Sequence, residues 1–506
     1  MTILNERRRI GRFISLLREQ KGLTQSEFAK KLKTSQSAVA RMEKGQQNFS
    51  TGMLAKISAV LNQEIITLAD QSLSFKINGG KKLSGTVTTK ASKNAGLALL
   101  CASLLNSGAT VLKNMPKIEE IYRIIEVLQS IGVIVKWNGS DLEIRKGKKL
   151  DLSKIDTEAA IKTRSVLMLI GSLAHSLKKF SLPLAGGCRL GRRTVRPHLY
   201  AMERLGVNIN TTHDKYEVAV GRLSPGEITL YETGDTVTEN TLMLAALIPG
   251  ATTVRLASSN YMVQDLCHFL QALGVKIEGV GSSILTVHGL PKINKKIEYW
   301  VSEDPIESML FLSLAATTGS ALEIKRCPVD FLALELLKLE KMGFKYKITK
   351  SYRSHNGFMN LADIKTFPSS LTALEEKLHP LPSNAGINID NLPFFVPVAT
   401  QARGTTLIHD WVYENRAVYY MELNKLRANI ILADTHRAYV EGPTELKGAE
   451  VVCPPALRPA AIILIAMLAA KGESILRNVY SINRGYEDLV NRLKALGAQI
   501  EILHGL

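Results

Sequence analysis

The sequence lacks two features that would place the chain in or across a membrane. A helix that spans a bilayer needs about 18 or more consecutive apolar residues, and the longest apolar candidate, residues 460–470, covers only eleven positions. Residues 1–12 are basic but contain no apolar segment of the kind found in secretory signals. We therefore expect neither a membrane span nor a secretory leader.

Cysteine is scarce and shows no pairing pattern. The chain has five cysteines, an odd number, and no two of them form a CxxC pair. They are Cys101, Cys188, Cys267, Cys327 and Cys453. This pattern argues against a disulfide framework and against a zinc site, and it favours a reducing cytoplasm as the location of the protein.

Acidic residues are outnumbered by basic ones. The chain has 46 Asp and Glu against 64 Lys and Arg, which gives a formal net charge of +18. Such an excess favours polyanionic partners, either nucleic acid or phosphorylated ligands, without choosing between them. The 506 residues are enough for about three domains.

The first seventy residues have the pattern of several short helices. Thr24 and Glu27 have the spacing of a capping box and predict a helix start. A turn over residues 33–35 separates this short helix from the next one, which Gly45 ends. Helical spacing of apolar residues predicts the others. The expected ranges are 7–20, 36–44 and 53–61.

Two short helices joined by such a turn make a helix-turn-helix. The segment LTQSEFAKKLKTSQSAVARMEKG resembles the phage-repressor-like Cro/C1 family, and the resemblance covers about residues 7–70. It implies a domain over residues 1–70 whose 36–44 helix enters the major groove of DNA. Gln36, Ser37 and Arg41 would then contact bases or phosphates, and Gln25 would contact a phosphate at a helix N-terminus.

Residues 1–70 carry 12 basic and 6 acidic side chains, which agrees with DNA binding. A homodimer is plausible because such modules often read paired half-sites. The alternative is a small helical bundle used for dimerisation or for contact with another protein.

After residue 70 one unit recurs six times. An amphipathic helix ends in a short turn, most often apolar-Gly-apolar, and a strand follows; glycine in this place is typical of a helix C-cap. The central residues are Gly132, Gly206, Gly274, Gly343, Arg427 and Gly497. A second glycine signature falls midway in every unit except the second. We therefore expect six helix–strand–helix–strand units of about 70 residues, with helices packed inside sheets.

A loop rich in arginine and glycine surrounds one of the cysteines. Residues 184–198 contain Cys188, four arginines and three glycines. Guanidinium groups lower the pKa of a nearby thiol, and they bind phosphate or carboxylate in a fixed fork. The combination indicates an anionic substrate handled by a reactive cysteine. The alternative is a solvated basic loop with an idle cysteine.

Two further positions carry charge where the repeat needs only a turn. Lys93 and Asn94 follow a predicted strand and open a helix, and amide groups at a helix N-terminus with a lysine form a phosphate site. Arg484 has the corresponding place in the last unit. The alternative for each is a solvated side chain.

These features together resemble the enolpyruvyl transferases, in particular the branch that acts on UDP-N-acetylglucosamine. The resemblance covers about residues 73–506 and includes residues 162–165, 413–416, 456–458 and 483–487. It implies an α/β fold of two inside-out α/β barrel domains built from six repeats, which meet at a cleft. One domain would be residues 93–300, and the other residues 72–92 with 301–506. The chain would cross between them near residues 89–92 and 299–304.

The resemblance also implies the reaction. The family moves an enolpyruvyl group from phosphoenolpyruvate to the 3′-hydroxyl of UDP-N-acetylglucosamine and releases phosphate, the first committed step of peptidoglycan synthesis. The chemistry is an addition and an elimination through a tetrahedral ketal, with no metal or organic cofactor. It needs an acid, a base and cations for the phosphate and carboxylate groups.

Residue by residue, the match implies that Cys188 is the acid, able to form an adduct with phosphoenolpyruvate, and that it is the thiol alkylated by fosfomycin in this family. Lys93, Arg193 and Arg484 would hold the phosphate, and Arg458 with Arg484 the carboxylate. Asn94, Arg164 and Asp390 would meet the amino sugar, with Asp390 as the base or, alternatively, only a helix cap. The match gives the remaining substrate-binding positions as Thr194, Val195, Arg196, Pro197, His198, Val412 and Arg416, most of them at the uridine end.

The sequence departs from the family at three places. Ala456 stands where members usually have an acidic residue, which puts the rate in doubt. Glu232 to Thr236 replaces a Lys-x-Ser-Val-Gly segment that contacts the diphosphate. Pro305 follows Asp304 where an arginine is common, and it is expected to stiffen the second crossing.

Two other functions fit parts of the pattern. A 5-enolpyruvylshikimate-3-phosphate synthase would share the fold, but that family has no catalytic thiol like Cys188. A transcriptional regulator could use a degenerate transferase body to sense a ligand; retention of the thiol with Lys93, Arg458 and Arg484 favours the active enzyme.

Overall fold

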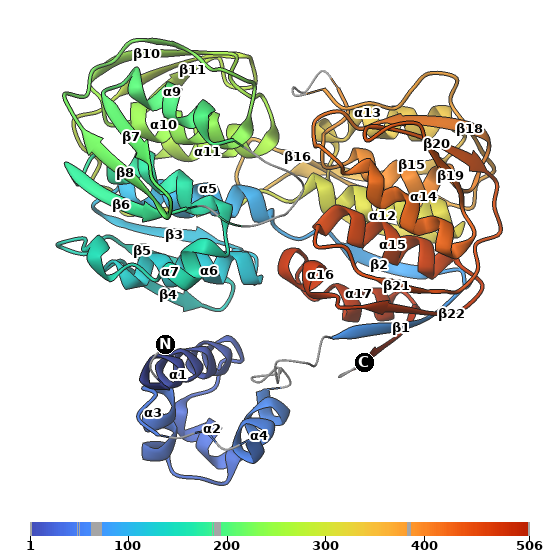
Figure 1. The fold of residues 1–506 in the computed structure, drawn as a ribbon, viewed down its shortest axis with the longest axis horizontal. Helices are drawn as coiled ribbons and strands as arrows, with labels where there is room; N and C mark the ends of the chain where they lie inside the picture. Colours follow the sequence, from blue (N-terminus) through green and yellow to red (C-terminus); the bar gives the residue numbers. More distant parts are fainter. Residues whose placement is uncertain are drawn as a thin grey trace. The chain divides into compact units, whose positions relative to one another are not determined.

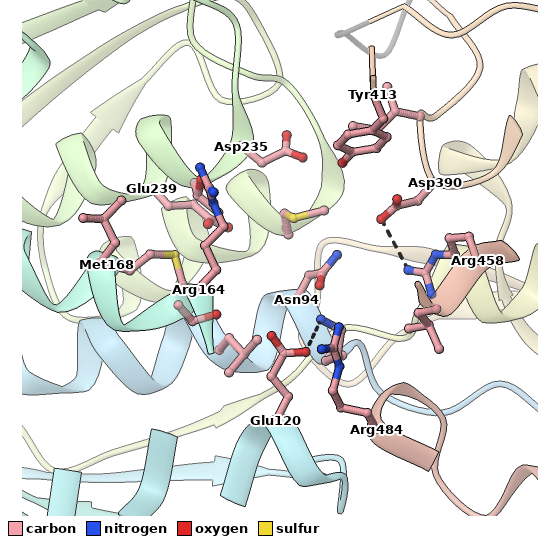
Figure 2. A pocket seen from close by; sticks show the side chains of 18 of the residues that line it. Asn94, Glu120, Arg164, Met168, Asp235, Glu239, Asp390, Tyr413, Arg458 and Arg484 are labelled. Carbon is pink, nitrogen blue, oxygen red and sulfur yellow. Dashed lines mark hydrogen bonds and ion pairs between the residues drawn. The ribbon is translucent and has the colours of Figure 1, made fainter. Parts of the chain in front are cut away.

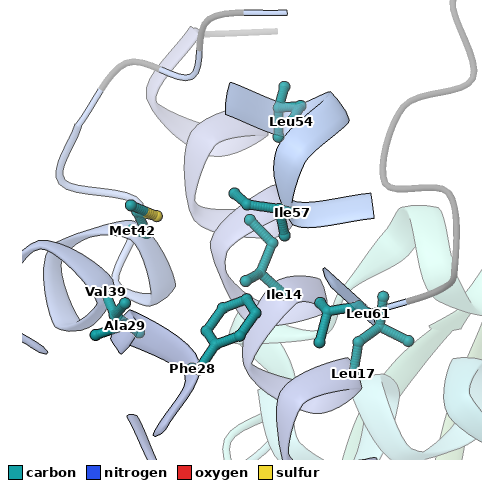
Figure 3. Close-up of a cluster of buried hydrophobic side chains, with 9 residues drawn as sticks. All are labelled: Ile14, Leu17, Phe28, Ala29, Val39, Met42, Leu54, Ile57 and Leu61. Atoms are coloured by element: carbon teal, nitrogen blue, oxygen red, sulfur yellow. The ribbon is translucent and has the colours of Figure 1, made fainter. Parts of the chain in front are cut away.

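Four helices before Leu73 form the first of two compact units in the computed structural model, which describes residues 3–47, 49, 51–61, 73–184, 186, 194–381 and 386–503. Their bounds are Ile3–Gln20 (α1), Gln25–Leu32 (α2), Gln36–Glu43 (α3) and Thr51–Leu61 (α4). Apolar side chains from all four helices make the core, including Ile14, Phe28, Val39 and Ile57, each fully buried (Figure 3). The helix-turn-helix arrangement is therefore present, although α1 begins four residues earlier than predicted and α4 two residues earlier.

The predicted capping chemistry is present at α2. The Thr24 hydroxyl accepts from the Glu27 backbone N–H, and the Glu27 carboxylate accepts from the Thr24 backbone N–H at 2.7 Å. Lys33 ends the helix in the left-handed conformation (φ 55°). This geometry sets the turn that leads into α3, whose N-cap is Ser35.

A buried polar network joins the first three helices. Arg18 on α1 donates to Glu43 on α3 through Nε (2.5 Å) and Nη2 (3.0 Å), and both side chains are more than nine-tenths buried. Gln25 on α2 donates to the same carboxylate at 2.8 Å, and Gln36 donates to Gln25 at 2.9 Å. The network fixes the angle between α2 and α3.

The described residues of the second unit form six sheets (Figure 1). Three are built mainly from the middle of the chain. Their strand orders are β13(Ile297–Trp300)-β3(Ala109–Lys113)-β5(Asp141–Arg145)-β4(Ile134–Asn138), β6(Lys179–Pro183)-β8(Lys215–Val220)-β7(Val207–Thr211) and β11(Lys276–Glu278)-β12(Ile284–Gly289)-β10(Gly250–Arg255)-β9(Glu227–Thr229).

The other three sheets combine the start of this unit with its C-terminal part. Their orders are β21(Glu450–Val452)-β22(Gly472–Arg477)-β1(Ser74–Gly79)-β23(Gln499–Leu503), β15(Lys345–Arg353)-β16(Asn360–Phe367)-β14(Ala321–Pro328)-β2(Ser84–Thr88) and β17(Leu371–Thr372)-β18(Ala402–His409)-β20(Arg437–Gly442)-β19(Asn429–Leu432). In five of the six sheets, one edge strand runs parallel to its neighbour. These parallel pairs are β9–β10, β13–β3, β2–β14, β17–β18 and β21–β22.

Helices fill the inside of each group of three sheets. In the first group these are α5 (Lys93–Ala102), α8 (Leu169–Leu173), α10 (Asp235–Ala245) and α11 (Tyr261–Ala272), which contact one another. In the second group they are α12 (Pro305–Thr318), α14 (Phe395–Ala399) and α15 (Leu457–Ala469). Every residue of α12 except Thr318 is buried. The predicted inside-out α/β fold is confirmed.

The remaining α-helices of the second unit are interspersed with the strands and inner helices along the chain. They are α6 (Glu119–Ser130), α7 (Thr157–Ile161), α9 (Arg196–Glu203), α13 (Ala333–Lys341), α16 (Tyr480–Gly485) and α17 (Leu489–Ala495). In the part of the chain that the structure describes, no helix has both the length and the apolarity needed to cross a membrane.

The repeat signature has one backbone geometry in all six units. The five central glycines have φ between 91° and 103°, and Arg427 has φ 66°. Only glycine adopts this region without strain. The structure thus confirms the helix C-cap in each unit, and it shows that the fifth unit uses a residue poorly suited to it.

The two segments in which we expected the chain to cross lie side by side. Ala91 pairs with Glu303 as an antiparallel bridge. Ser92 donates its N–H to the carbonyl of Ser302 at 2.7 Å, and Asp304 donates to that of Lys90 at 2.9 Å. The two groups of sheets are therefore joined by two hydrogen-bonded segments.

Candidate active site

A cavity of about 210 Å³ is lined by side chains from both groups of sheets (Figure 2). The helices α5, α6 and α10 contribute residues from one group, and α15 and α16 from the other. Its charged and polar lining consists of Lys93, Asn94, Glu120, Arg164, Ser165, His198, Asp235, Thr236, Glu239, Asp390, Tyr413, Arg416, Arg458 and Arg484.

Many residues singled out in the sequence come together here. Eight of them line the cavity: Lys93, Asn94, Arg164, His198, Asp390, Arg416, Arg458 and Arg484. Thr194, Val195, Arg196 and Pro197 are not among the lining residues; Thr194 and Val195 precede α9, and Arg196 and Pro197 open this helix, which also carries His198. Arg164 donates to the carbonyl of Thr194 at 3.2 Å. Val412 is also absent from the lining, whereas its neighbour Tyr413 is part of it.

Cys188 and Arg193 lie outside the described residues. The other four cysteines are described, and all are buried. Burial raises the pKa of Cys267, Cys327 and Cys453 to about 12 and raises that of Cys101 further. Because the thiolate is the reactive form, these four thiols are unreactive near neutral pH.

One end of the cavity holds a carboxylate between two cations. Lys93, the first residue of α5, approaches Glu120 of α6 with Nζ 2.9 Å from Oε2. Burial alone raises the pKa of Glu120, but Lys93 and Arg484 outweigh it, so that the pKa lies below its usual value. The buried Nε of Arg484 has no hydrogen-bond partner among the described residues.

A second cluster of charge surrounds Asp390. Arg458 places Nη2 3.3 Å from one oxygen of Asp390 and donates through Nη1 to the Tyr486 hydroxyl at 3.0 Å. Arg416 lies on the other side, with Nη1 3.8 Å from the second oxygen. The carboxylate of Asp390 thus sits between two guanidinium groups.

Arg416 itself belongs to the wall of the cavity. It is completely buried and makes two bonds to the Asp410 carboxylate, at 2.6 and 2.8 Å. It also donates to the carbonyl of Ile389 at 2.6 Å and stacks on the Tyr413 ring. Its donors therefore tie the segment that carries Asp390 to Asp410, which directly follows β18.

The opposite side of the cavity carries two acidic groups on α10. Asp235 accepts from Ser258 at 2.6 Å and from Asn260 at 3.2 Å. Glu239 is 1% exposed, and its Oε1 has no hydrogen-bond partner in the described chain. Burial, with help from neighbouring carboxylates, raises the pKa of both groups. A neutral Glu239 is a hydrogen-bond donor inside the cavity.

His198 is held neutral beside these carboxyl groups. It is 4% exposed and contacts Asn240 and Thr236 through its two ring nitrogens at 3.3 and 3.4 Å. Burial, reinforced by the charge of Arg164, lowers its pKa to about 3.

The departures from the family pattern can be placed. Ala456 is buried at the N-cap of α15 and makes no side-chain cap bond. From the altered segment, Asp235 and Thr236 line the cavity, whereas the exposed Glu232 does not. Pro305 occupies the first turn of α12, where no backbone N–H is needed.

Sequence reasoning missed Glu120 and Glu239 as parts of the site. Glu120 follows Glu119 in the first turn of α6, and two adjacent acidic residues there are also explained by the helix dipole. Glu239 stands between Thr238 and Asn240 inside α10, and no sequence motif marks it.

In the N-terminal unit, the predicted DNA-contacting side chains have different surroundings. Gln36, Ser37 and Arg41 are exposed on α3, whereas Gln25 is half-buried and hydrogen-bonded to Glu43.

Family models match both parts of the chain. The family described as EPSP synthase (3-phosphoshikimate 1-carboxyvinyltransferase) matches residues 77–493. A helix-turn-helix family matches residues 14–68. The first match covers most of the chain, and the second covers the N-terminal unit.

Curated relatives are named UDP-N-acetylglucosamine 1-carboxyvinyltransferase. The one from Treponema denticola is 34% identical over 432 residues, which cover 85% of this chain and 99% of the relative. Those from Bradyrhizobium diazoefficiens and Borreliella burgdorferi are each 32% identical, and the match covers 98% of each.

Solved structures share the fold at lower identity. The enolpyruvyl transferase NikO from Streptomyces tendae superposes with a TM-score of 0.75 at 24% identity, over 86% of this chain and all of that one. An EPSP synthase from Acinetobacter baumannii gives a TM-score of 0.68 at 18% identity, over 85% of this chain and all of that one.

Proposed function

Because the chain belongs to the family of UDP-N-acetylglucosamine 1-carboxyvinyltransferases, we propose that it transfers the enolpyruvyl group of phosphoenolpyruvate to the 3′-hydroxyl of UDP-N-acetylglucosamine. The observation that carries this proposal is the convergence of Lys93, Arg458 and Arg484 with Asp390 in one cavity. Cations of this kind suit a substrate with both a phosphate and a carboxylate group.

The proposed reaction has two steps. In the first, the sugar hydroxyl adds to C2 of phosphoenolpyruvate, loses its proton to a base, and C3 gains a proton from an acid. In the second, C3 loses a proton and the C2–O bond to phosphate breaks, which restores the double bond and releases inorganic phosphate. Charge on the phosphate rises as the bond breaks, and fixed cations stabilise that charge.

Asp390 is the proposed base and Cys188 the proposed acid. The position of Asp390 between Arg458 and Arg416 orients its carboxylate toward the cavity, as a base requires. Cys188 is proposed from the family resemblance and from the arginines that flank it in the sequence. The unreactive state of the four described cysteines agrees with a single functional thiol.

The nucleotide end of the site is proposed to lie toward α9 and α10. His198, Thr236 and Glu239 line that side and offer neutral hydrogen-bonding groups. Asp235 replaces part of the segment that contacts the diphosphate in the family, so we expect weaker binding of UDP-N-acetylglucosamine than family members show.

Phosphate release from phosphoenolpyruvate tests the reaction. With UDP-N-acetylglucosamine present, the wild type should release phosphate, and Cys188→Ala should release far less. Cys267→Ala, which removes a buried thiol of α11 away from the cavity lining, should behave as the wild type. Absence of release from a folded protein that still binds the nucleotide sugar would favour the alternative, a ligand-sensing regulator with a degenerate transferase body.

The N-terminal unit is proposed to bind DNA through α3. The exposed Gln36, Ser37 and Arg41 occupy the helix that enters the major groove in helix-turn-helix proteins. Selection from a random pool of duplexes should enrich a common sequence, and Arg41→Ala should weaken binding to it. Lys56→Ala, which removes an exposed charge on α4, serves as the control. A pool that shows no enrichment would favour a protein-contact module.

A further inference from the structure

Glu120 lies beside the two cations that receive phosphate in the proposed function. Its carboxylate lies 2.9 Å from Nζ of Lys93, and both side chains are largely buried, at 12% and 15% exposure. Figure 2 shows the Glu120 carboxylate beside the guanidinium of Arg484, which comes from α16 in the other group of sheets. Among the described residues that line this end of the cavity, Glu120 is the only acidic side chain.

Lys93 and Arg484 interact with the Glu120 carboxylate in different ways. Lys93 is paired with Glu120 directly. Arg484 interacts with Glu120 through its charge, yet its buried Nε donates to no group among the described residues. Buried donors are nearly always satisfied in folded proteins. The unpaired donor therefore indicates room for an additional acceptor at this end of the cavity.

The backbone around Glu120 is held in place from both sides. Tyr480 of α16 donates its hydroxyl to Glu119 at 2.9 Å, and the N–H of Lys117 donates to Glu487 at 3.0 Å. These bonds tie the start of α6 to the segment that carries Arg484. Any rearrangement on anion binding must therefore occur in the Glu120 side chain and not in its helix.

We propose that the carboxylate of Glu120 is a built-in competitor of phosphate for Lys93 and Arg484. An entering phosphate must displace this carboxylate from Lys93 or share the site with it. In either case, Glu120 weakens phosphate binding, because like charges at close range repel and a released carboxylate loses its partner. The inference rests on the proposed function, in which these two cations receive phosphate.

The competition affects product more than substrate. Phosphoenolpyruvate carries a carboxylate as well as a phosphate, and Arg458 is placed to hold that second group. Inorganic phosphate has only the Lys93 and Arg484 end of the cavity. The unfavourable effect of Glu120 on binding at this end therefore removes a larger share of the binding free energy of inorganic phosphate than of phosphoenolpyruvate. This difference assists release of the product and limits inhibition by it.

Calorimetric titration of the full chain with inorganic phosphate tests the proposal. Glu120→Gln keeps the shape and removes the charge, so it should bind phosphate about tenfold more tightly than the wild type, which corresponds to about 1.4 kcal/mol. Glu126→Gln is the matched control, since Glu126 lies on the same helix, pairs with Arg123 at 2.7 Å and is outside the cavity lining. It should bind phosphate as the wild type does.

Two further variants distinguish failure of the competitor role of Glu120 from failure of the phosphate-site assignment. Glu120→Asp keeps the charge on a shorter side chain and should fall between the wild type and Glu120→Gln. Arg484→Gln should weaken phosphate binding in both the wild-type and the Glu120→Gln backgrounds. Equal or weaker binding by a folded Glu120→Gln would overturn the competitor role while leaving the phosphate site intact. Indifference of phosphate binding to Arg484→Gln would instead overturn the assignment of the phosphate site, and the competitor role with it.

Discussion

Two carboxylates of the cavity are paired with cations of its own lining. Asp390 lies between Arg458 and Arg416, and Glu120 is bound by Lys93. An unpaired buried charge is costly, so these internal pairs stabilise the site. When a substrate binds, pairs between protein side chains are replaced by pairs between the protein and the substrate. The affinity for the substrate therefore depends on the difference in free energy between these two kinds of pair.

Thiol reactivity is expected to be confined to one residue. The four described cysteines are at most 6% exposed and their thiols have raised pKa values. A maleimide or an epoxide added to the native protein should therefore modify one site, as measured by intact-protein mass spectrometry. Cys188→Ala should take up none, and prior binding of both substrates should slow the wild-type reaction. Rapid labelling at a second cysteine in the folded protein would contradict this prediction.

His198 should make stability depend on pH. In the folded protein its pKa is about 3, whereas an unfolded histidine titrates near 6.5. The unfolded state binds more protons between these values, so the free energy of unfolding should fall as pH falls through that window. His198→Gln should lose about 2 kcal/mol less than the wild type between pH 7 and pH 5. Denaturant titrations at the two pH values measure this difference, with the exposed His213→Gln as control.

Single-residue function was predictable only where a motif marked it. Lys93 and Arg484 stood at turns where the repeat needed no charge, and both line the cavity. Glu120 carried no such signal, because an acidic pair at a helix start is also explained by the dipole. Its role depends on Arg484, which is 364 positions later in the chain, and a contact at that separation cannot be read from local pattern.

At the scale of elements, the repeat turns show what local sequence determines. Glycine after each amphipathic helix predicted a left-handed C-cap, and the observed φ values confirm it in five units. The remaining C-cap, at Arg427 in the fifth unit, was predicted only from its position in the repeat. The missing glycine of the second unit coincides with a sheet of three strands among the described residues, where a short 3-10 helix over Leu152–Lys154 contacts β6.

Arg427 offers a simple route to a more stable protein. A non-glycine residue in this conformation is strained by about 1–2 kcal/mol, and Arg427 is exposed. After allowing for the greater freedom of glycine in the unfolded chain, Arg427→Gly should stabilise the protein by about 0.5–1 kcal/mol. Gly497→Ala, where an added Cβ meets nothing within 4 Å, should destabilise by about 1 kcal/mol from backbone strain alone. Thermal unfolding would reveal whether the two shifts have opposite signs.

The N-terminal helices depend on one buried ion pair that local pattern could not predict. Arg18 and Glu43 are polar positions on helices that look solvated in sequence, yet both are buried. Glu43→Gln should destabilise this unit by about 3 kcal/mol, because it leaves the Arg18 charge without its main partner. Glu19→Gln removes the half-exposed partner of Arg18 and should cost less than about 1 kcal/mol. Loss of helical circular dichroism from this unit on heating measures both.

At the scale of the whole molecule, the two units are expected to work separately. The part of the chain that matches the curated relatives covers 98–99% of their length, and the family model for the transferase matches residues 77–493, all of which follow the N-terminal helices. A chain that begins at Leu73 should keep its phosphate release unchanged and lose DNA binding, as measured by the two assays above. Loss of phosphate release from a folded truncated chain would show that the N-terminal unit contributes to the reaction.

The paired crossings bear on how such a molecule can be taken apart. Ser92 and Ser302 are joined by a hydrogen bond of 2.7 Å, so the segment between them begins and ends at one point, as a domain inserted into another does. A chain without that segment could be closed across the gap with almost no loop. Because the two ends of this segment are adjacent, new chain termini could also be introduced within residues 93–301, and the segment would still be attached to the rest of the chain at one of its ends.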